Sequence, residues 1–184
     1  MNILRKSFLA VMLLVTTGAA VAAQETKMEP KPAPKEKASP ATIAEGTIKG
    51  AKVQIKYSSP AVKGRKIWGE LVPFDKVWRA GANEATTFET DKPLNIQGKT
   101  LPAGKYSIYA LPGEKEWKVM FNSAVGQWGI TRGGETTEDA TKDVVVVTVK
   151  ASKSKEFNER LLYVITANGF TINWENVTVP VMFK

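Results

Sequence analysis

The chain of 184 residues contains no cysteine and no histidine. It therefore has no thiol nucleophile, no histidine-based catalytic triad and none of the usual side-chain ligands of zinc or copper sites. Disulfide bridges are excluded for the same reason. A Gly-rich phosphate-binding loop of the P-loop type is missing as well. Acid–base chemistry would fall to Asp, Glu, Lys or Tyr, and the sequence predicts neither a metal site nor a cofactor.

Amphipathic helical periods are also missing. No long stretch repeats its apolar side chains every three or four positions, and only 154–160 suggests a single helical turn. Apolar and polar residues alternate instead, beginning with 51–57, and this period of two is typical of half-buried strands. The segments with a strand pattern are 51–57, 105–111, 116–121, 143–150, 161–167, 170–175 and 177–183.

Three local signals refine this strand prediction. The segment 112–115 and the pair Asn168-Gly169 indicate hairpin turns, and Asn-Gly favours a type I′ turn. The valine-rich run over 144–149 predicts a strand covered on both faces. Pro180 has no backbone donor, so 177–183 is predicted to be an edge strand or a bulged one. We therefore predict one all-β domain over residues 42–184, an antiparallel β-sandwich, with an open β-barrel as the alternative.

The N-terminus has the pattern of an export signal. Arg5 and Lys6 precede an uncharged apolar run over 8–21, and 20–22 is a small-residue cleavage site. The run is shorter than the roughly 20 residues of a membrane helix, so we predict a signal peptide over 1–23 and no membrane span after its cleavage. Residues 24–41 are rich in Pro, Lys and Glu and predict a disordered tether. We expect an exported protein, periplasmic or secreted.

The formal net charge of +8 helps to decide which classes of partner the chain is expected to bind. The basic residues are scattered along the chain rather than gathered in a stripe, so we expect no nucleic-acid partner. A positive surface does favour weak attraction to anionic sugars, lipid headgroups or acidic surfaces. The expected partner is a small polar or anionic ligand or a glycan. The sequence identifies no protein partner.

The strand alternation fails between Ser58 and Thr90. This segment combines glycines and tryptophans with charged side chains, which is typical of a functional loop on a rigid β scaffold. An arginine there can bind a carboxylate or phosphate through two donors, and indole faces can stack on a ring or hold a cation. The candidate ligand-binding residues, one of them from the later run 127–129, are Trp68, Trp78, Arg79, Asn83, Glu84 and Trp128.

Several runs of this sequence, taken in order, resemble the exported bacterial family catalogued as domain of unknown function 2911. They are YSSPAVKGR at 57–65, IWG at 67–69, VWRAGANEAT at 77–86, LPAGKYS at 101–107, PGEKEW at 112–117, FN at 121–122 and QWG at 127–129. The resemblance covers roughly residues 45–184. It implies a secreted or periplasmic β-rich domain. It implies no established activity and so assigns no catalytic residue.

Two interpretations of the candidate residues stay open. In the first they line a pocket for a small polar or anionic ligand, and the chain is a non-catalytic binding or accessory domain. In the second Arg79 pairs with Glu84 and the tryptophans plug one end of the sandwich.

Two other functions are alternatives. The first is a carboxylate-based hydrolase of envelope carbohydrate, in which Glu84 would act beside Asp75 or Glu70. The second is a structural or protein-interaction domain that pairs with a partner through an edge strand over 177–183.

Overall fold

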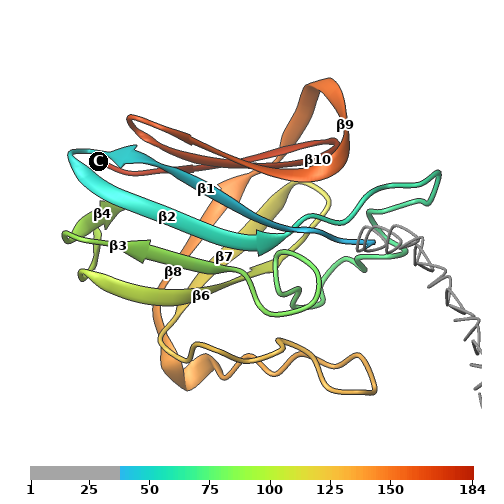
Figure 1. The fold of residues 1–184 in the computed structure, drawn as a ribbon, viewed down its shortest axis with the longest axis horizontal. Coiled ribbons are helices and arrows are strands. Elements are labelled where there is room, and N and C mark those ends of the chain that lie inside the picture. The colour runs from blue at the N-terminus through green and yellow to red at the C-terminus, as the bar shows by residue number, and fades with distance from the viewer. Residues whose placement is uncertain (1–37) are drawn as a thin grey trace, which may run out of the picture. The chain divides into compact units, whose positions relative to one another are not determined.

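The computed structural model describes residues 38–184, which Figure 1 shows as a ribbon. The predicted signal peptide over 1–23, and all of the predicted tether except 38–41, lie outside the described residues. The described chain is all-β with antiparallel sheets, so the predicted fold class is confirmed. Within residues 38–184 we find no helix of the length and hydropathy that a membrane span requires.

Ten strands and one short helical turn make up the described chain. They are β1 (Ala41–Ile48), β2 (Ala51–Ser58), β3 (Thr87–Thr90), β4 (Leu94–Ile96), β5 (Lys99–Leu101), β6 (Gly104–Leu111), β7 (Glu116–Asn122), the 3-10 helix η1 (Ala140–Lys142), β8 (Asp143–Lys150), β9 (Ser152–Thr166) and β10 (Gly169–Met182). Residue 41, which the sequence assigned to the tether, is already part of β1.

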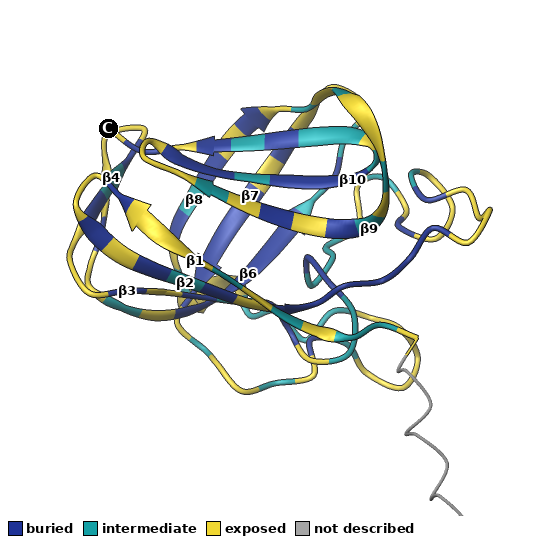
Figure 2. Ribbon diagram, turned by 45° about the horizontal axis from the view of Figure 1, so that its top comes forward, coloured by how far each residue is buried: buried dark blue, intermediate teal, exposed yellow. Residues whose placement is uncertain are grey.

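The strands form two layers. In the first, β1, β2, β3, β6, β7 and β8 lie side by side in that order as one antiparallel sheet. The second layer is the β9–β10 hairpin, which covers one face of this sheet, and Figure 2 shows its buried residues alternating with exposed ones. β4 and β5 form a separate short hairpin. Two packed layers of antiparallel strands make a β-sandwich-like fold.

Strand β10 folds back on itself. The backbone N–H of Phe183, just after the strand, donates to the carbonyl oxygen of Asn168, just before it, at 2.8 Å. The two ends of β10 therefore lie together, and its two arms can be followed in Figure 2. The reversal falls at Glu175, which has a φ of +54° and lies where the pairing with β9 shifts register. These arms correspond to the two strand segments, 170–175 and 177–183, that the sequence predicted.

Aromatic rings fill the space between the layers. Phe88 and Phe121 come from the six-stranded sheet, while Phe170 and Phe183 come from the second layer and its end. All four are buried, with ring centroids 5.3 to 6.5 Å apart. Aromatic pairs at this spacing contribute beyond their buried area. This cluster therefore fastens the β9–β10 hairpin to the sheet.

The predicted hairpin at Asn168-Gly169 is present, but its turn is one residue earlier. Thr166 pairs with Gly169, so the two turn residues are Ala167 and Asn168. Neither has the positive φ that a type I′ turn requires, so that turn type was wrong. Gly169 is needed for close approach instead, because a Cβ there would lie 2.1 Å from the carbonyl oxygen of Val181 in the returning arm.

Two further strand predictions need correction. Residues 154–160 form no helical turn, because they extend β9 toward its start at Ser152. β8 is the last strand of its sheet and is not covered on both faces, since Val144 is 41% exposed. Its outer edge is bonded by side chains: Gln97 donates to the carbonyl oxygen of Thr148 at 2.7 Å, and Lys99 donates to that of Val146 at 2.7 Å. Such caps protect an edge from pairing with another chain.

Replacing Phe170 by Ala removes ring contacts to four aromatic neighbours and leaves a cavity between the layers. We expect the free energy of unfolding, measured by urea denaturation, to fall by about 3–5 kcal/mol. Phe157→Ala is the matched control, because Phe157 is 55% exposed and its truncation should change stability by less than about 0.5 kcal/mol. Similar losses for both variants would contradict the assigned core.

Candidate functional site

The irregular segment between β2 and β3 is bonded into the sheet. Trp78 and Ala110 of β6 exchange two backbone hydrogen bonds, of 2.7 Å from the Trp78 N–H and 2.8 Å from the Ala110 N–H. β3, which begins at Thr87, pairs with the same edge of β6. The backbone of Trp78 is therefore held in the sheet like that of a strand residue, although Trp78 lies in a long connection.

A tight loop follows Trp78 and is held by hydroxyl groups. Ala80 is fully buried in a left-handed conformation with φ of +53°, which costs a non-glycine residue about 1 kcal/mol or more. Its carbonyl oxygen accepts a hydrogen bond of 2.8 Å from the Tyr163 hydroxyl and one of 3.0 Å from the Thr86 hydroxyl. Gly81 has no room for a side chain, since a Cβ would lie 2.6 Å from the Thr86 Oγ1.

Asn83 joins this loop to the first described residues. It has a φ of +57°, and its Nδ2 donates to the Ser39 carbonyl oxygen at 3.2 Å and to the Ser58 Oγ at 3.1 Å. The backbone N–H of Ala82 also donates to the carbonyl oxygen of Ser58, at 3.3 Å. Asn83 therefore uses its amide donors to hold the chain together, and it does not line the cleft described below.

Four of the five tryptophans form one cluster at this end of the sandwich. Trp68 packs edge-on against Trp78, Trp117 and Trp174, with centroids 4.9 to 5.9 Å apart. Trp78 and Trp174 are stacked at 5.9 Å with planes 18° apart. Trp174 continues the inward alternation of Phe170 and Ile172 in β10 and lies just before Glu175, where the pairing with β9 shifts register.

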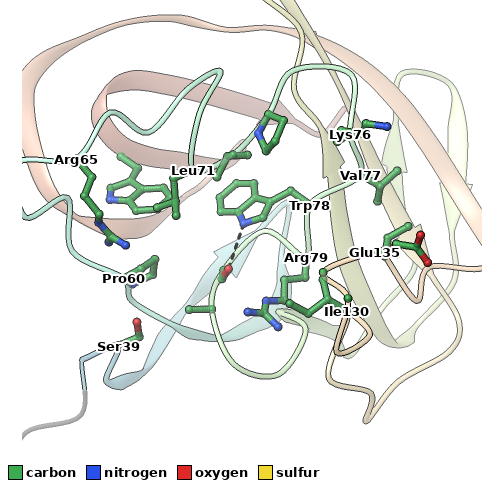
Figure 3. A pocket seen from close by; sticks show the side chains of 18 residues that line it. Ser39, Pro60, Arg65, Leu71, Lys76, Val77, Trp78, Arg79, Ile130 and Glu135 are labelled. Carbon is green, nitrogen blue, oxygen red and sulfur yellow. Dashed lines mark hydrogen bonds between the residues drawn. The ribbon is translucent and has the colours of Figure 1, made fainter.

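The Trp cluster presents ring faces rather than hydrogen-bonding atoms. The indole N–H of Trp78 donates to the Gly81 carbonyl oxygen at 3.1 Å, the bond drawn in Figure 3. The indole nitrogens of Trp68 and Trp174 are sealed from solvent and have no hydrogen-bond partner. Edge-to-face packing can offset part of that cost through weak N–H···π contacts. The surface that the cluster presents is therefore apolar.

The run 127–129 docks onto the same loop. The carbonyl oxygen of Gln127 accepts from the Ala85 N–H at 3.1 Å, and that of Trp128 accepts from Arg79 Nη1 at 3.2 Å. The Arg79 guanidinium also lies 5.7 Å from the centre of the Trp128 ring, within cation–π range. Gly129 packs directly on Arg79, where a Cβ would lie 2.8 Å from the arginine Cβ. Two separate sequence motifs therefore form one structural unit.

The predicted pairing of Arg79 with Glu84 does not occur as an ion pair. The two ion pairs within residues 38–184 are Lys66–Glu70 and Lys142–Asp139, both at the surface. Burial lowers the pKa of Arg79, and the nearby negative charge of Glu84 works in the opposite direction. Glu84 itself is exposed. The aromatic-plug interpretation is therefore supported for the tryptophans of the cluster but not for the Arg79–Glu84 pair.

A cleft of about 730 Å³ opens beside the Trp cluster, as Figure 3 shows. One wall comes from the connection between β2 and β3, and the other comes from the loop between β7 and η1. Three cations and one carboxylate lie among its lining residues, which are Ser39, Pro60, Arg65, Leu71, Val72, Pro73, Lys76, Val77, Trp78, Arg79, Gly81, Ala82, Ile130, Gly133, Gly134, Glu135, Thr136 and Trp174.

The cleft brings together only part of the predicted site. Trp78 and Arg79 line it, whereas Trp68 lies within the Trp cluster, and Asn83, Glu84 and Trp128 are not among the lining residues. Glu70 and Asp75, the proposed partners of Glu84, are exposed and do not line it either. Glu135 is the carboxylate of the cleft. The predicted carboxylate pair is therefore not assembled there.

The sequence did not predict that the loop between β7 and η1 forms a wall of the cleft, nor that Trp174 lines it. Trp174 follows a hairpin in regular alternation and has the pattern of an ordinary core residue. Ile130 and Glu135 belong to a Gly-rich run with the composition of a solvated loop, yet a bridge between Ile130 and Thr136 makes it a small hairpin. The only available signal was the neighbouring run 127–129, which is one of the runs that carry the family resemblance.

Comparison with known families places this site in context. The model of the family described as protein of unknown function (DUF2911) matches residues 39–183. The chain belongs to this family. The match begins at Ser39, which lines the cleft, and includes both motifs that dock on each other. No protein of curated function and no solved structure is similar enough to match.

The Ala80 carbonyl provides a test of how the loop is held. Tyr163→Phe and Thr86→Val each remove one of its two hydroxyl donors, so each should lower the free energy of unfolding by about 1 kcal/mol. The double variant leaves a buried carbonyl without either donor, and its loss should exceed the sum of the single losses. Urea denaturation of all four proteins measures the coupling. Strict additivity would show that the two hydroxyls do not share the carbonyl.

Alkaline pH provides a second test. Burial raises the pKa of Tyr163, and also of Tyr57, Tyr106 and Tyr109, above the usual 10.0. The unfolded chain releases these protons near pH 10 while the folded chain keeps them. Stability is therefore fully present below that pH and falls above it, by up to about 1.4 kcal/mol per pH unit for Tyr163, whose pKa is raised most, and by less for the other three. Urea midpoints between about pH 8 and about pH 11 should show this fall, less steeply in Tyr163→Phe.

Proposed function

We propose that this protein is an exported, non-catalytic binding domain whose cleft beside Trp78 holds a small organic anion. The observation that carries the proposal is the composition of the cleft. Its lining residues include three cations, Arg65, Lys76 and Arg79, but only one carboxylate, Glu135. The stacked rings of Trp78 and Trp174 supply aromatic surface to the same cleft. The volume of about 730 Å³ lies within the usual range of pockets for small molecules.

The cations differ in how free they are to bind a ligand. Arg65 donates from Nε to the carbonyl oxygen of Val62 at 3.0 Å and from Nη2 to that of Ala61. Arg79 is engaged with Trp128. Lys76 is exposed and forms no hydrogen bond or ion pair with residues 38–184, so its ammonium group is available. Two fixed guanidinium groups and one free ammonium group favour a carboxylate or phosphate without a large loss of side-chain entropy.

The geometry of the cleft supports a binding function better than a hydrolytic one. Glycoside hydrolysis requires two carboxyl groups on opposite sides of the scissile bond. The cleft supplies one, Glu135, on a hairpin whose tip contains Gly133 and Gly134. The cleft residues also include no amide side chain that would orient a carbonyl group. The hydrolase therefore remains a weaker alternative than a binding domain.

Charge substitutions in the cleft should change anion binding in opposite directions. We expect Lys76→Gln to weaken the binding of a small anion by about 3- to 10-fold, and Glu135→Gln to strengthen it by about 2- to 5-fold. Glucuronate, benzoate and octanoate are suitable probes, with glucose, benzyl alcohol and octanol as uncharged counterparts. Thermal shifts identify the binders, and calorimetric titration then gives each Kd.

Lys118→Gln is the matched control, because Lys118 is an exposed lysine of β7 that does not line the cleft. It should leave every Kd unchanged. The proposal fails if no anion binds, if charged and uncharged probes bind alike, or if the Lys118 control weakens binding as much as the Lys76 variant does.

A further inference from the structure

We infer that the natural ligand of this cleft is a single-chain amphiphile, with an anionic head among Arg65, Lys76 and Arg79 and a hydrocarbon tail along the apolar wall. The inference rests on the proposed function and goes further by naming the class of anion. It is carried by the combination of three cations with a lining that is otherwise mostly apolar.

Most of the apolar lining lies on one wall of the cleft. Leu71, Val72, Pro73 and Val77 come from one connection, and Ile130 comes from the opposite hairpin. Figure 3 shows Leu71 and Trp78 beside each other, with Ile130 on the far side of Arg79. Leu71 is 45% exposed although it is a large aliphatic residue, so part of this wall lies open to solvent. Covering such a surface with hydrocarbon is favourable in proportion to the area buried.

A sugar would find few partners here. The uncharged polar side chains among the lining residues are only those of Ser39 and Thr136, so most of the polar side chains of the cleft carry a charge. Asn83, the nearest amide in the loop, is committed to Ser39 and Ser58. The indole nitrogens are either bonded to the backbone or sealed from solvent. A sugar hydroxyl that lies against the apolar lining would therefore lose its water without gaining a partner, which is unfavourable.

The charges indicate the sign of the head group. All three cations belong to the connection between β2 and β3, while Glu135 stands on the opposite hairpin. In the view of Figure 3, Arg65 and Lys76 lie on opposite sides of Trp78. A carboxylate or phosphate head can thus lie against one wall while the tail follows the indole and aliphatic surface. A cleft of drug-like size suits one chain rather than a two-chain lipid.

A homologous series of fatty acids tests the tail. Isothermal titration of the full chain with hexanoate, octanoate and decanoate, each kept below its micelle concentration, gives Kd against chain length. We expect binding to strengthen by about fourfold for each methylene that is buried, so decanoate should bind roughly 15-fold more tightly than octanoate if both added methylenes are covered. A difference below about twofold would overturn the inference.

Two pairs of variants separate the head from the tail. Leu71→Ser should weaken decanoate and uncharged decanol alike, by about 5- to 10-fold, while Leu162→Ser should weaken neither. Leu162 is a fair control because it is 43% exposed, close to the exposure of Leu71, and does not line the cleft. Lys76→Gln should weaken decanoate but not decanol. Any binding of fatty acid by the apolar run over 8–21 is common to all variants and cancels in these comparisons.

The outcomes distinguish this inference from the proposed function. If glucuronate or benzoate binds and chain length has no effect, the cleft is an anion site and the amphiphile inference is wrong. If no anion of any kind binds, both fail. Binding to vesicles that contain phosphatidylglycerol, without binding of monomeric decanoate, would also overturn the inference, because it would indicate a membrane surface as the partner.

Discussion

The carbonyl oxygen of Ala80 connects the two layers of this protein at the point where the cleft begins. It accepts one hydroxyl from Thr86 in its own loop and one from Tyr163 in the second layer. These two bonds help to offset the cost of the left-handed backbone at a buried alanine. Trp78 and Arg79 precede this residue directly, so the direction of both side chains into the cleft depends on how the loop is held. The same loop therefore joins the two layers and carries two side chains of the cleft.

The local patterns of the sequence were sufficient for most of the sheet. Alternation predicted β2, β6, β7 and both arms of β10, because every second side chain in each of them joins the core between the layers. β6 and β7 are partly buried on their other face as well, where Tyr109 and Met120 pack with Ala85 in a second, small cluster. The missed elements are short or mostly exposed. β3 has four residues, although Phe88 in it is buried, β4 and β5 have three residues each, and β1 has mostly exposed side chains. The helical turn expected over 154–160 was wrong because that stretch lies in the exposed first half of β9, where apolar periodicity gives no information.

The cleft was harder to predict because its walls meet only through the tertiary fold. Trp78 and Arg79 stood out in the sequence, since an irregular stretch with aromatic and charged residues is unusual in a period-two chain. Trp174 did not, because its place in the alternation of β10 is that of an ordinary core residue, and only the tertiary fold brings the other indoles against it. Asn83 was singled out correctly as special, but its amide serves the loop. A residue type indicates which bonds are available, and only the fold decides which partner receives them.

Ser39 lines the cleft, and the chain contains no cysteine. A cysteine introduced at position 39 would be the only thiol in the molecule, so an environment-sensitive dye could be attached there without a background reaction. Its emission would change when a ligand displaces water from the cleft. The architecture therefore offers a fluorescent reporter that responds to whichever compound enters the cleft and that could be used to screen extracts of small molecules directly.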